Sequence, residues 1–289
     1  RAIALEIAFE IKEHAWLILL LDAREDLARM NLTSLEEAYD LIATQVRLGE
    51  TRELEAISLD VEVRRARYQL NTIVTEKRFA SRHLNALLGN SLPEGFEVAG
   101  ELTWERMTNE TPADEALRTH PLIGRSESEL AYARSQLGLA RSLNIPDPAI
   151  SGFTGQEIDG RIRGVGISFE FPLWNQNAKE VTRSRSIADM MSWELERTRL
   201  DLSTEIAVRQ GHLALSTEQL EIFEEGLLNQ AEVRLQLSET SYRQGEISLL
   251  EFLDAQRTYY SILNDYQDSL YNWNLDRAAL AKAVGEEIR

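Results

Sequence analysis

Cysteine is absent from this chain of 289 residues, and aromatic residues and long apolar runs are scarce. Without cysteine the chain can form neither a disulfide framework nor a thiolate metal site. The longest apolar run, Ala15 to Leu21, ends at Asp22. A helix needs about 20 apolar residues to cross a bilayer, so we expect no transmembrane helix.

Basic residues are also fewer than acidic residues, 31 against 48, and the formal net charge is −17. Binding to nucleic-acid phosphates requires a positive surface, so nucleic acid is not expected as a partner. Aromatic residues make up only 7% of the chain, against 27% charged and 43% hydrophobic residues. This mixture is typical of long helices packed side by side, and it contains enough apolar residues to exclude a disordered chain.

The residue groupings of common catalytic and metal sites are missing as well. No Ser/His/Asp or Cys/His grouping stands out, and Gly164-Val165-Gly166 lacks the further glycine of a phosphate loop. The four histidines lie far apart without the spacing of metal ligands: His14, His83, His120 and His212. We therefore expect no enzyme, no cofactor and no metal site.

The chain does contain an internal repeat. Residues 47–50 (RLGE) have a counterpart in residues 243–246 (RQGE), and upstream residues 6–8 (EIA) match residues 205–207. Further identities follow both tetrapeptides at one constant offset: Leu54 with Leu250, Glu55 with Glu251, Leu84 with Leu280, and Gly89 with Gly285. A repeat on this scale indicates one structural unit used twice.

Each copy has the apolar spacing of two long antiparallel helices. Residues recur every seven positions, which is the signature of a coiled coil. In the second copy these residues are Ile206, Leu213, Leu220 and Leu227, then Phe252, Tyr259, Tyr266, Trp273 and Leu280. In the first copy they are Leu21, Ala28, Leu35 and Ile42, then Val63, Leu70 and Leu84. A parallel stripe of Val208, Leu215 and Ile222 predicts neighbours on both sides of one helix, as in a closed ring.

Glycines mark the two tips where the helices of each copy turn. Gly49 and Gly245 fit the left-handed position that ends a helix. After the second tip, Ser248 and Glu251 have the spacing of a capping box that starts the returning helix. An arm from about Glu205 to Gln244 would span roughly 60 Å at 1.5 Å per residue.

Between the copies the pattern changes three times. Residues 90–112 are irregular and are expected to pack against the helices, and a helix is expected from about Ala113 to Ser142. Residues 145–174 then form a β segment with a hairpin turn at Asp159-Gly160. Apolar residues alternate there with small or polar ones: Val165, Ile167, Phe169 and Phe171. The alternation suits a membrane barrel strand, and equally a sheet half-buried in a soluble protein.

In this order of elements the chain resembles the TolC-like outer membrane factors, and within them the CzcC-like branch of heavy-metal efflux pumps. Three stretches carry the likeness: residues 145–177 with the hairpin and FPLWNQN, residues 242–257 (YRQGEISLLEFLDAQR), and residues 117–121 (LRTHP). Together with the repeat, they cover nearly the whole chain. One departure is that family members contribute two β hairpins per subunit. The resemblance places the first hairpin, its leading helix and the export signal upstream of Arg1.

The resemblance implies a mainly α fold in which three identical subunits build an α-barrel continued by a membrane β-barrel. It divides the chain into a first helical hairpin (1–89), an equatorial element (90–112), a helix (113–144), a barrel hairpin (145–174) and a second helical hairpin (175–289). The homotrimer would lie in the outer membrane of a Gram-negative bacterium, in contact with its lipid. It would be a passive efflux duct working with a periplasmic adaptor and an inner-membrane transporter, with heavy-metal cations as the cargo favoured by the branch.

Site residues follow from the resemblance by position. Glu251 and Asp254 correspond to an acidic constriction ring, and Glu55 to an acidic partner of Tyr242 in a lock at the tip. The docking surface for the adaptor would include Arg47, Gly49, Arg243 and Gly245, and the lipid-facing strand Val165, Ile167, Phe169 and Phe171. Simpler roles remain open: Glu251 as a cap, Asp254 as a surface charge and Tyr242 as a coiled-coil contact. The alternative proteins are a periplasmic adaptor and a soluble helical scaffold.

Overall fold

The computed structural model describes residues 2–106, 113–143, 148–157, 160–169 and 177–286. Contacts divide the chain into two compact units, Arg1–Thr111 with Glu205–Arg289, and Pro112–Thr204. The fold is mainly α-helical with a two-stranded β hairpin, as the sequence predicts.

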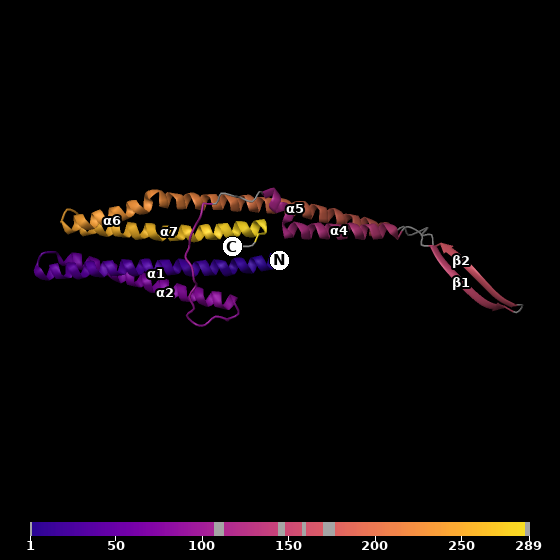
Figure 1. The fold of residues 1–289 in the computed structure, drawn as a ribbon, viewed down its shortest axis with the longest axis horizontal. Helices are drawn as coiled ribbons and strands as arrows, with labels where there is room; N and C mark the ends of the chain where they lie inside the picture. The colour runs from indigo at the N-terminus through magenta and orange to yellow at the C-terminus, as the bar shows by residue number, and fades with distance from the viewer. Residues whose placement is uncertain (1, 107–112, 144–147, 158–159, 170–176, 287–289) are drawn as a thin grey trace. The chain divides into compact units, whose positions relative to one another are not determined.

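The first unit contains the first predicted helical hairpin. Helix α1 (Ala2–Leu48) and helix α2 (Glu53–Leu87) lie side by side and antiparallel (Figure 1). The heptad positions face the seam between them, since Leu21, Leu35 and Ile42 of α1 are buried, as are Val63 and Leu84 of α2. Burial of these side chains therefore holds the pair together.

The second hairpin is formed by helix α6 (Leu228–Arg243) and helix α7 (Leu249–Val284), with helix α5 (Ala178–Ile222) before them. Ile206, Leu213 and Leu220 are buried as predicted. The expected continuous arm from Glu205 to Gln244 is interrupted by a π-helical turn, η1 (Phe223–Leu227), where Gly226 has a φ of 147°. Only glycine adopts that backbone conformation easily, so this residue kinks the arm.

The irregular segment after α2 packs against both helical pairs of the first unit. Phe96 and Val98 contact the cluster between α1 and α2, while Leu102 and Trp104 contact the cluster between α5 and α7. The side chain of Asn274 donates a hydrogen bond to the backbone oxygen of Thr103 at 3.1 Å. Residues 90–106 thus pack against the helices as expected for the predicted element 90–112, of which residues 107–112 lie outside the described residues.

The second unit contains helix α3 (Ala113–Thr119), helix α4 (Pro121–Ser142) and the strands β1 (Pro148–Glu157) and β2 (Gly160–Phe169), with the start of α5. The helix expected from Ala113 to Ser142 is divided at His120. Pro121 has no backbone N–H and begins a new helix, and His120 Nδ1 accepts the N–H of Leu122 at 3.2 Å.

The two strands pair antiparallel over their whole length, from Pro148 opposite Phe169 to Glu157 opposite Gly160. Gly160 has a φ of 149°, in agreement with the predicted turn, whereas Asp159 lies outside the described residues. Among the helices that the structure describes, none combines the length and apolarity needed to cross a bilayer.

Candidate functional site

The tips of the two hairpins have the same backbone geometry. Gly49 and Gly245 each have a φ of 75°. In the first tip the N–H of Glu50 donates to Gln45 O at 2.9 Å, and in the second the N–H of Glu246 donates to Ser241 O at 2.9 Å. Each glycine N–H also donates to the carbonyl three residues before it. This is the Schellman motif, so the predicted equivalence of the two tips is confirmed at the level of single hydrogen bonds.

The chain leaves the second tip through the predicted capping box. Ser248 Oγ accepts the N–H of Glu251 at 3.3 Å, and Glu251 Oε2 accepts the N–H of Ser248 at 2.8 Å. The hydrogen bond from the Ser248 backbone, followed by that from its side chain, lowers the pKa of Glu251. Glu251 is therefore ionised and fixed at the start of α7, with its side chain exposed.

Tyr242 and Glu55, which belong to different hairpins, meet at the tip. Tyr242 Oη donates to Glu55 Oε2 at 3.5 Å, and its ring stacks on Phe252 at 5.4 Å between centroids. Burial first, and then the charge of Glu55, raise the pKa of Tyr242 to about 12. The side chain of Arg52 lies 3.6 Å from Glu55. The sequence left open whether Tyr242 makes a polar contact with Glu55 or a packing contact in the coiled coil. In the structure it makes both.

The remaining charged tip residues lie on the surface. Asp254 is exposed and pairs with Arg234 at 2.9 Å, on the same face of α7 as Glu251. Arg243 pairs with Glu239 of its own helix at 2.5 Å. Arg47 donates to Thr44 Oγ1 at 3.0 Å. The structure brings these residues to the tip region but does not join them into one cluster.

The strand residues of the second unit project into solvent in the single chain. Val165, Ile167 and Phe169 are 78%, 66% and 54% exposed, and Phe171 lies outside the described residues. On β1, Ile150 is opposite Ile167 and is 77% exposed. The hairpin therefore presents apolar side chains that are more than half exposed on both of its strands.

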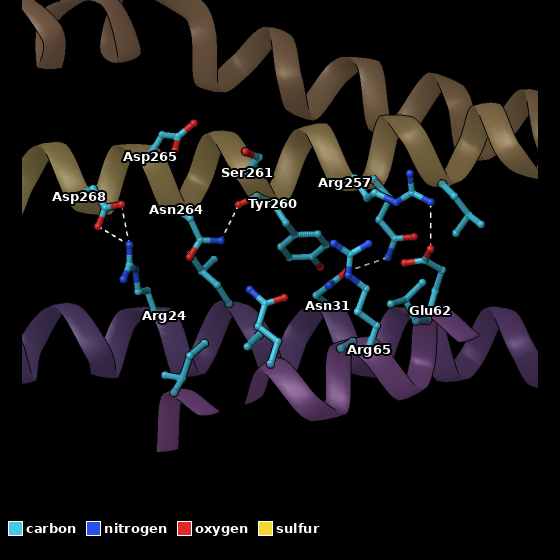
Figure 2. A pocket seen from close by; sticks show the side chains of 18 residues that line it. Arg24, Asn31, Glu62, Arg65, Arg257, Tyr260, Ser261, Asn264, Asp265 and Asp268 are labelled. Atoms are coloured by element: carbon cyan, nitrogen blue, oxygen red, sulfur yellow. Dashed lines mark hydrogen bonds and ion pairs between the residues drawn. The ribbon is translucent and has the colours of Figure 1, made fainter. Parts of the chain in front are cut away.

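A polar cleft of about 460 Å³ between α1, α2 and α7 was not predicted (Figure 2). Arg24 binds Asp268 at 2.5 Å at one end, and Arg257 binds Glu62 at 2.9 Å at the other. Gln256, next to Arg257 in sequence, is buried and donates to Asn31 Oδ1 at 3.2 Å. In the sequence, each of these polar residues could be an exposed residue of a single helix. The cleft therefore becomes visible only when the helices are packed together.

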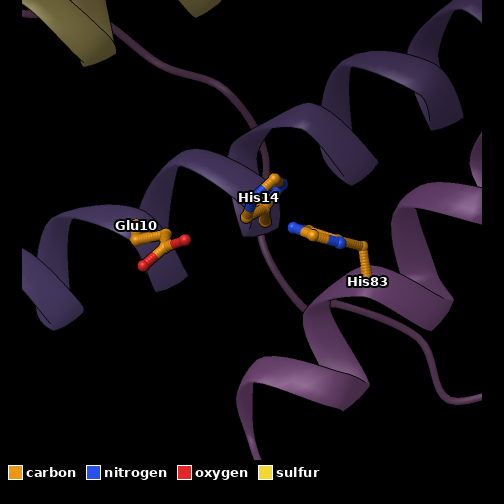
Figure 3. A group of neighbouring side chains, drawn as sticks. All are labelled: Glu10, His14 and His83. Atoms are coloured by element: carbon orange, nitrogen blue, oxygen red, sulfur yellow. The ribbon is translucent and has the colours of Figure 1, made fainter.

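The structure also joins two of the histidines that the sequence separates. The rings of His14 on α1 and His83 on α2 lie 4.4 Å apart between centroids, and Glu10 is one turn before His14 (Figure 3). The sequence analysis missed this group, because the spacing from residue 14 to residue 83 matches no ligand motif. The spacing of Glu10 and His14, four apart on a helix, was the one available signal.

Comparison with known proteins identifies the family. The model of the family "Outer membrane efflux protein" matches residues 113–286. The cobalt-zinc-cadmium resistance protein CzcC of Cupriavidus metallidurans is 23% identical over 88% of this chain and 62% of its own length. The pyoverdine export outer membrane protein OpmQ of Pseudomonas aeruginosa is 26% identical over 93% of this chain and 59% of its own. The chain thus spans about three fifths of the length of these two relatives.

Solved structures agree with this assignment at the level of the fold. The structure of CusC, described in relation to transmembrane channel formation, superposes with a TM-score of 0.81 at 17% identity, covering 99% of this chain and 70% of that one. The Campylobacter jejuni CmeC outer membrane channel gives a TM-score of 0.77 at 17% identity, covering 99% and 64%. The predicted TolC-like fold is thereby confirmed. The family model and the relatives agree with the predicted location in the outer membrane of a Gram-negative bacterium. The relatives are efflux channels and not enzymes, and this chain belongs to the outer membrane efflux protein family.

Proposed function

We propose that the protein is the outer membrane channel subunit of a tripartite efflux pump, a passive exit duct that is gated at the periplasmic tips of its helical hairpins. The observation that carries the proposal is the pair of equivalent hairpins, each ending in the same glycine turn, in a member of this family. Of the five sequence divisions given above, the first helical hairpin (1–89) and the second (175–289) would form the α-barrel. The equatorial element would lie beside them, and the barrel hairpin would enter the membrane.

Two exposed apolar stripes support assembly into a ring. Val208, Leu215 and Ile222 of α5 are 50%, 54% and 54% exposed. A second stripe follows α2 at the same sevenfold spacing, namely Leu54, Val61 and Tyr68, which are 66%, 57% and 74% exposed. Two different edges that bind each other form a heterologous interface, and such an interface closes into a ring when the rotation from one subunit to the next adds up to a full turn. We take the ring to be the homotrimer of the family.

Covalent cross-linking measures the assembly directly. We expect Leu215→Glu to shift the protein from trimer to monomer, because a charge would be buried in the interface. Ala214→Glu is the matched control, since Ala214 is also exposed but lies about 100° around the helix from Leu215. Loss of the trimer in both variants, or in neither, would remove the stripe from the interface.

The gate is proposed at the acidic residues of the tip. Glu251 and Asp254 are exposed on one face of α7, and threefold symmetry would bring six carboxylates together. Such a ring attracts cations and repels anions. The contact between Tyr242 and Glu55 would hold the two hairpins of a subunit in the closed state. Arg47, Gly49, Arg243 and Gly245 would then present the tips to the periplasmic adaptor and its inner-membrane transporter.

Ion selectivity in planar lipid bilayers tests the acidic ring in channels of the full-length protein. We expect cation selectivity to fall in Asp254→Ala and further in the double variant with Glu251→Ala. Glu218→Ala removes an exposed carboxylate of α5 far from the tip and should leave selectivity unchanged. If the tip variants behave like this control, the two carboxylates are a surface charge and a helix cap, and the ring is not there.

The membrane segment and the cargo complete the proposal. The exposed residues Val165, Ile167 and Phe169 would face lipid, once strands from other subunits close a barrel. The likeness to CzcC favours heavy-metal cations as the cargo, whereas OpmQ exports pyoverdine by its name. The cargo is read out by the metal tolerance of a host strain that depends on this channel, measured for cobalt, zinc and cadmium beside an organic siderophore.

A further inference from the structure

We propose that Glu10, His14 and His83 form a binding site for a divalent transition-metal ion, of which Zn²⁺ is the representative, at the end of the α1–α2 hairpin remote from its tip. Two imidazoles and one carboxylate are the donors that zinc, nickel and cobalt accept in proteins. The inference does not rest on the proposed channel function, because binding to the site requires neither a membrane nor a partner.

The geometry of the three side chains fits a single ion. One candidate ligand atom from each residue lies within 4.8 Å of the other two. Figure 3 shows His83 reaching from α2 toward His14, with Glu10 on the same helix as His14. Ligands on an ion with bonds of about 2.1 Å lie at most about 4.2 Å apart. Glu10 and His83 are both exposed, so small changes of their rotamers can bring the ligand atoms within this limit.

The buried nitrogen of His14 points to a missing ligand. Nδ1 of His14 is inaccessible to solvent and has no hydrogen-bond partner among the described residues. A buried polar atom without a partner is unfavourable, and such atoms are uncommon in folded proteins. A bound cation would satisfy one nitrogen of each imidazole, and the two rings already lie close together at 4.4 Å between centroids.

The internal repeat shows that the fold does not need histidine at this place. Leu21 and Leu84 of the first copy are buried together, as Leu220 and Leu280 of the second copy are packed together. His14 lies seven residues before Leu21, just as Leu213 lies seven residues before Leu220. Leu213 is buried in an apolar cluster. The first copy thus has the imidazole of His14 at the position where the second copy has the buried side chain of Leu213.

A metal ion at this site would cross-link two long helices near their free ends. The turn at Gly49 joins α1 to α2 at one end, and the ion would join residues 14 and 83 at the other. An ion that binds only the folded chain stabilises it by RT ln(1 + c/Kd), where c is the concentration of free ion, so the effect grows with the ion concentration and with the affinity. The site therefore predicts a metal-dependent rise in the melting temperature of the chain.

Titration of the chain with Co²⁺ and Zn²⁺ tests the site. We expect one tight equivalent, a visible absorption band of bound Co²⁺ that has the intensity of four- or five-coordination, and displacement of Co²⁺ by Zn²⁺. His14→Gln and His83→Gln should each lose the band and at least about 100-fold in affinity, since even indirect partners of metal ligands cost roughly 10–100-fold. Glu10→Gln should weaken binding and alter the band.

His212→Gln is the matched control, because His212 is exposed on α5 and outside the group. It should keep the band, the affinity and the melting shift. Circular dichroism of each variant without metal shows that the helices remain folded. Equal binding by the control and by the double variant His14→Gln with His83→Gln would assign the ions to surface carboxylates and overturn the proposal. Absence of tight binding in the unaltered, folded chain would overturn it as well.

Discussion

Replacing Gly245 by alanine measures how strongly the second tip depends on a left-handed backbone. Gly245 has a φ of 75°, and a Cβ built there meets no atom within 4 Å. The cost therefore comes from the backbone alone, and a left-handed conformation costs an L residue roughly 1–2 kcal/mol. Alanine also restricts the unfolded chain, which returns about 0.4–1 kcal/mol. We expect the free energy of unfolding to fall by about 1 kcal/mol.

Gly211 provides the matched control inside a helix. It lies within α5 without a positive φ, and its Cβ would also meet no atom within 4 Å. There the same substitution should stabilise the protein by roughly 0.5–1 kcal/mol, because alanine is the better helix former. Urea unfolding followed by circular dichroism gives both values. Changes of the same sign at Gly245 and Gly211 would refute the reasoning from backbone conformation.

Four other predictions concern contacts within the first unit. The raised pKa of Tyr242 stabilises the folded protein fully below pH 10, and this contribution is lost as the pH rises to about 12. Tyr242→Phe should therefore remove this alkaline loss of stability. Absorbance titration at 295 nm detects the missing tyrosine. Ser248→Ala should lower the free energy of unfolding by about 1 kcal/mol. The folded-state pKa of Glu251 is lowered, so Glu251→Ala should destabilise the protein above pH 4.5. This effect should disappear as the pH falls from 4.5 through the lower folded-state pKa, and melting curves in the acid range check both variants. A double-mutant cycle on Arg24 and Asp268 should give a coupling of about 1 kcal/mol or more, and a value near zero would make their short contact irrelevant.

Local sequence signals predicted the tips and seams of the hairpins correctly. The left-handed glycines, the capping box of Ser248 and the heptad stripes depend on residues at most a few turns apart, so one helix is enough to recognise them. The same local signals did not predict the helix break at Pro121 or the kink at Gly226. Each lies in a segment whose apolar spacing continues on both sides, and the spacing outweighed a single helix breaker.

Contacts between distant segments could not be predicted in this way. The cleft pairs Arg24 with Asp268, and the histidine group pairs residues 14 and 83. Which charged residue of α1 meets which residue of α7 depends on the register between helices, and the heptad pattern leaves that register open by whole turns. The pairing of Tyr242 with Glu55 was expected only because the family resemblance supplied it.

The seam between the two hairpins differs in chemistry along its length, and this difference bears on the proposed gate. Near the tips it is apolar, with Ile42, Leu59, Val63 and Phe252 buried in one cluster. Farther from the tips it becomes the polar cleft. Polar groups that separate regain hydrogen bonds from water, which offsets part of the cost of opening the cleft. Separating α7 from α1 and α2 in the apolar cluster exposes apolar surface without such an offset. In the proposed gate, a tip built in this way would stay closed until contacts with the adaptor supply that energy.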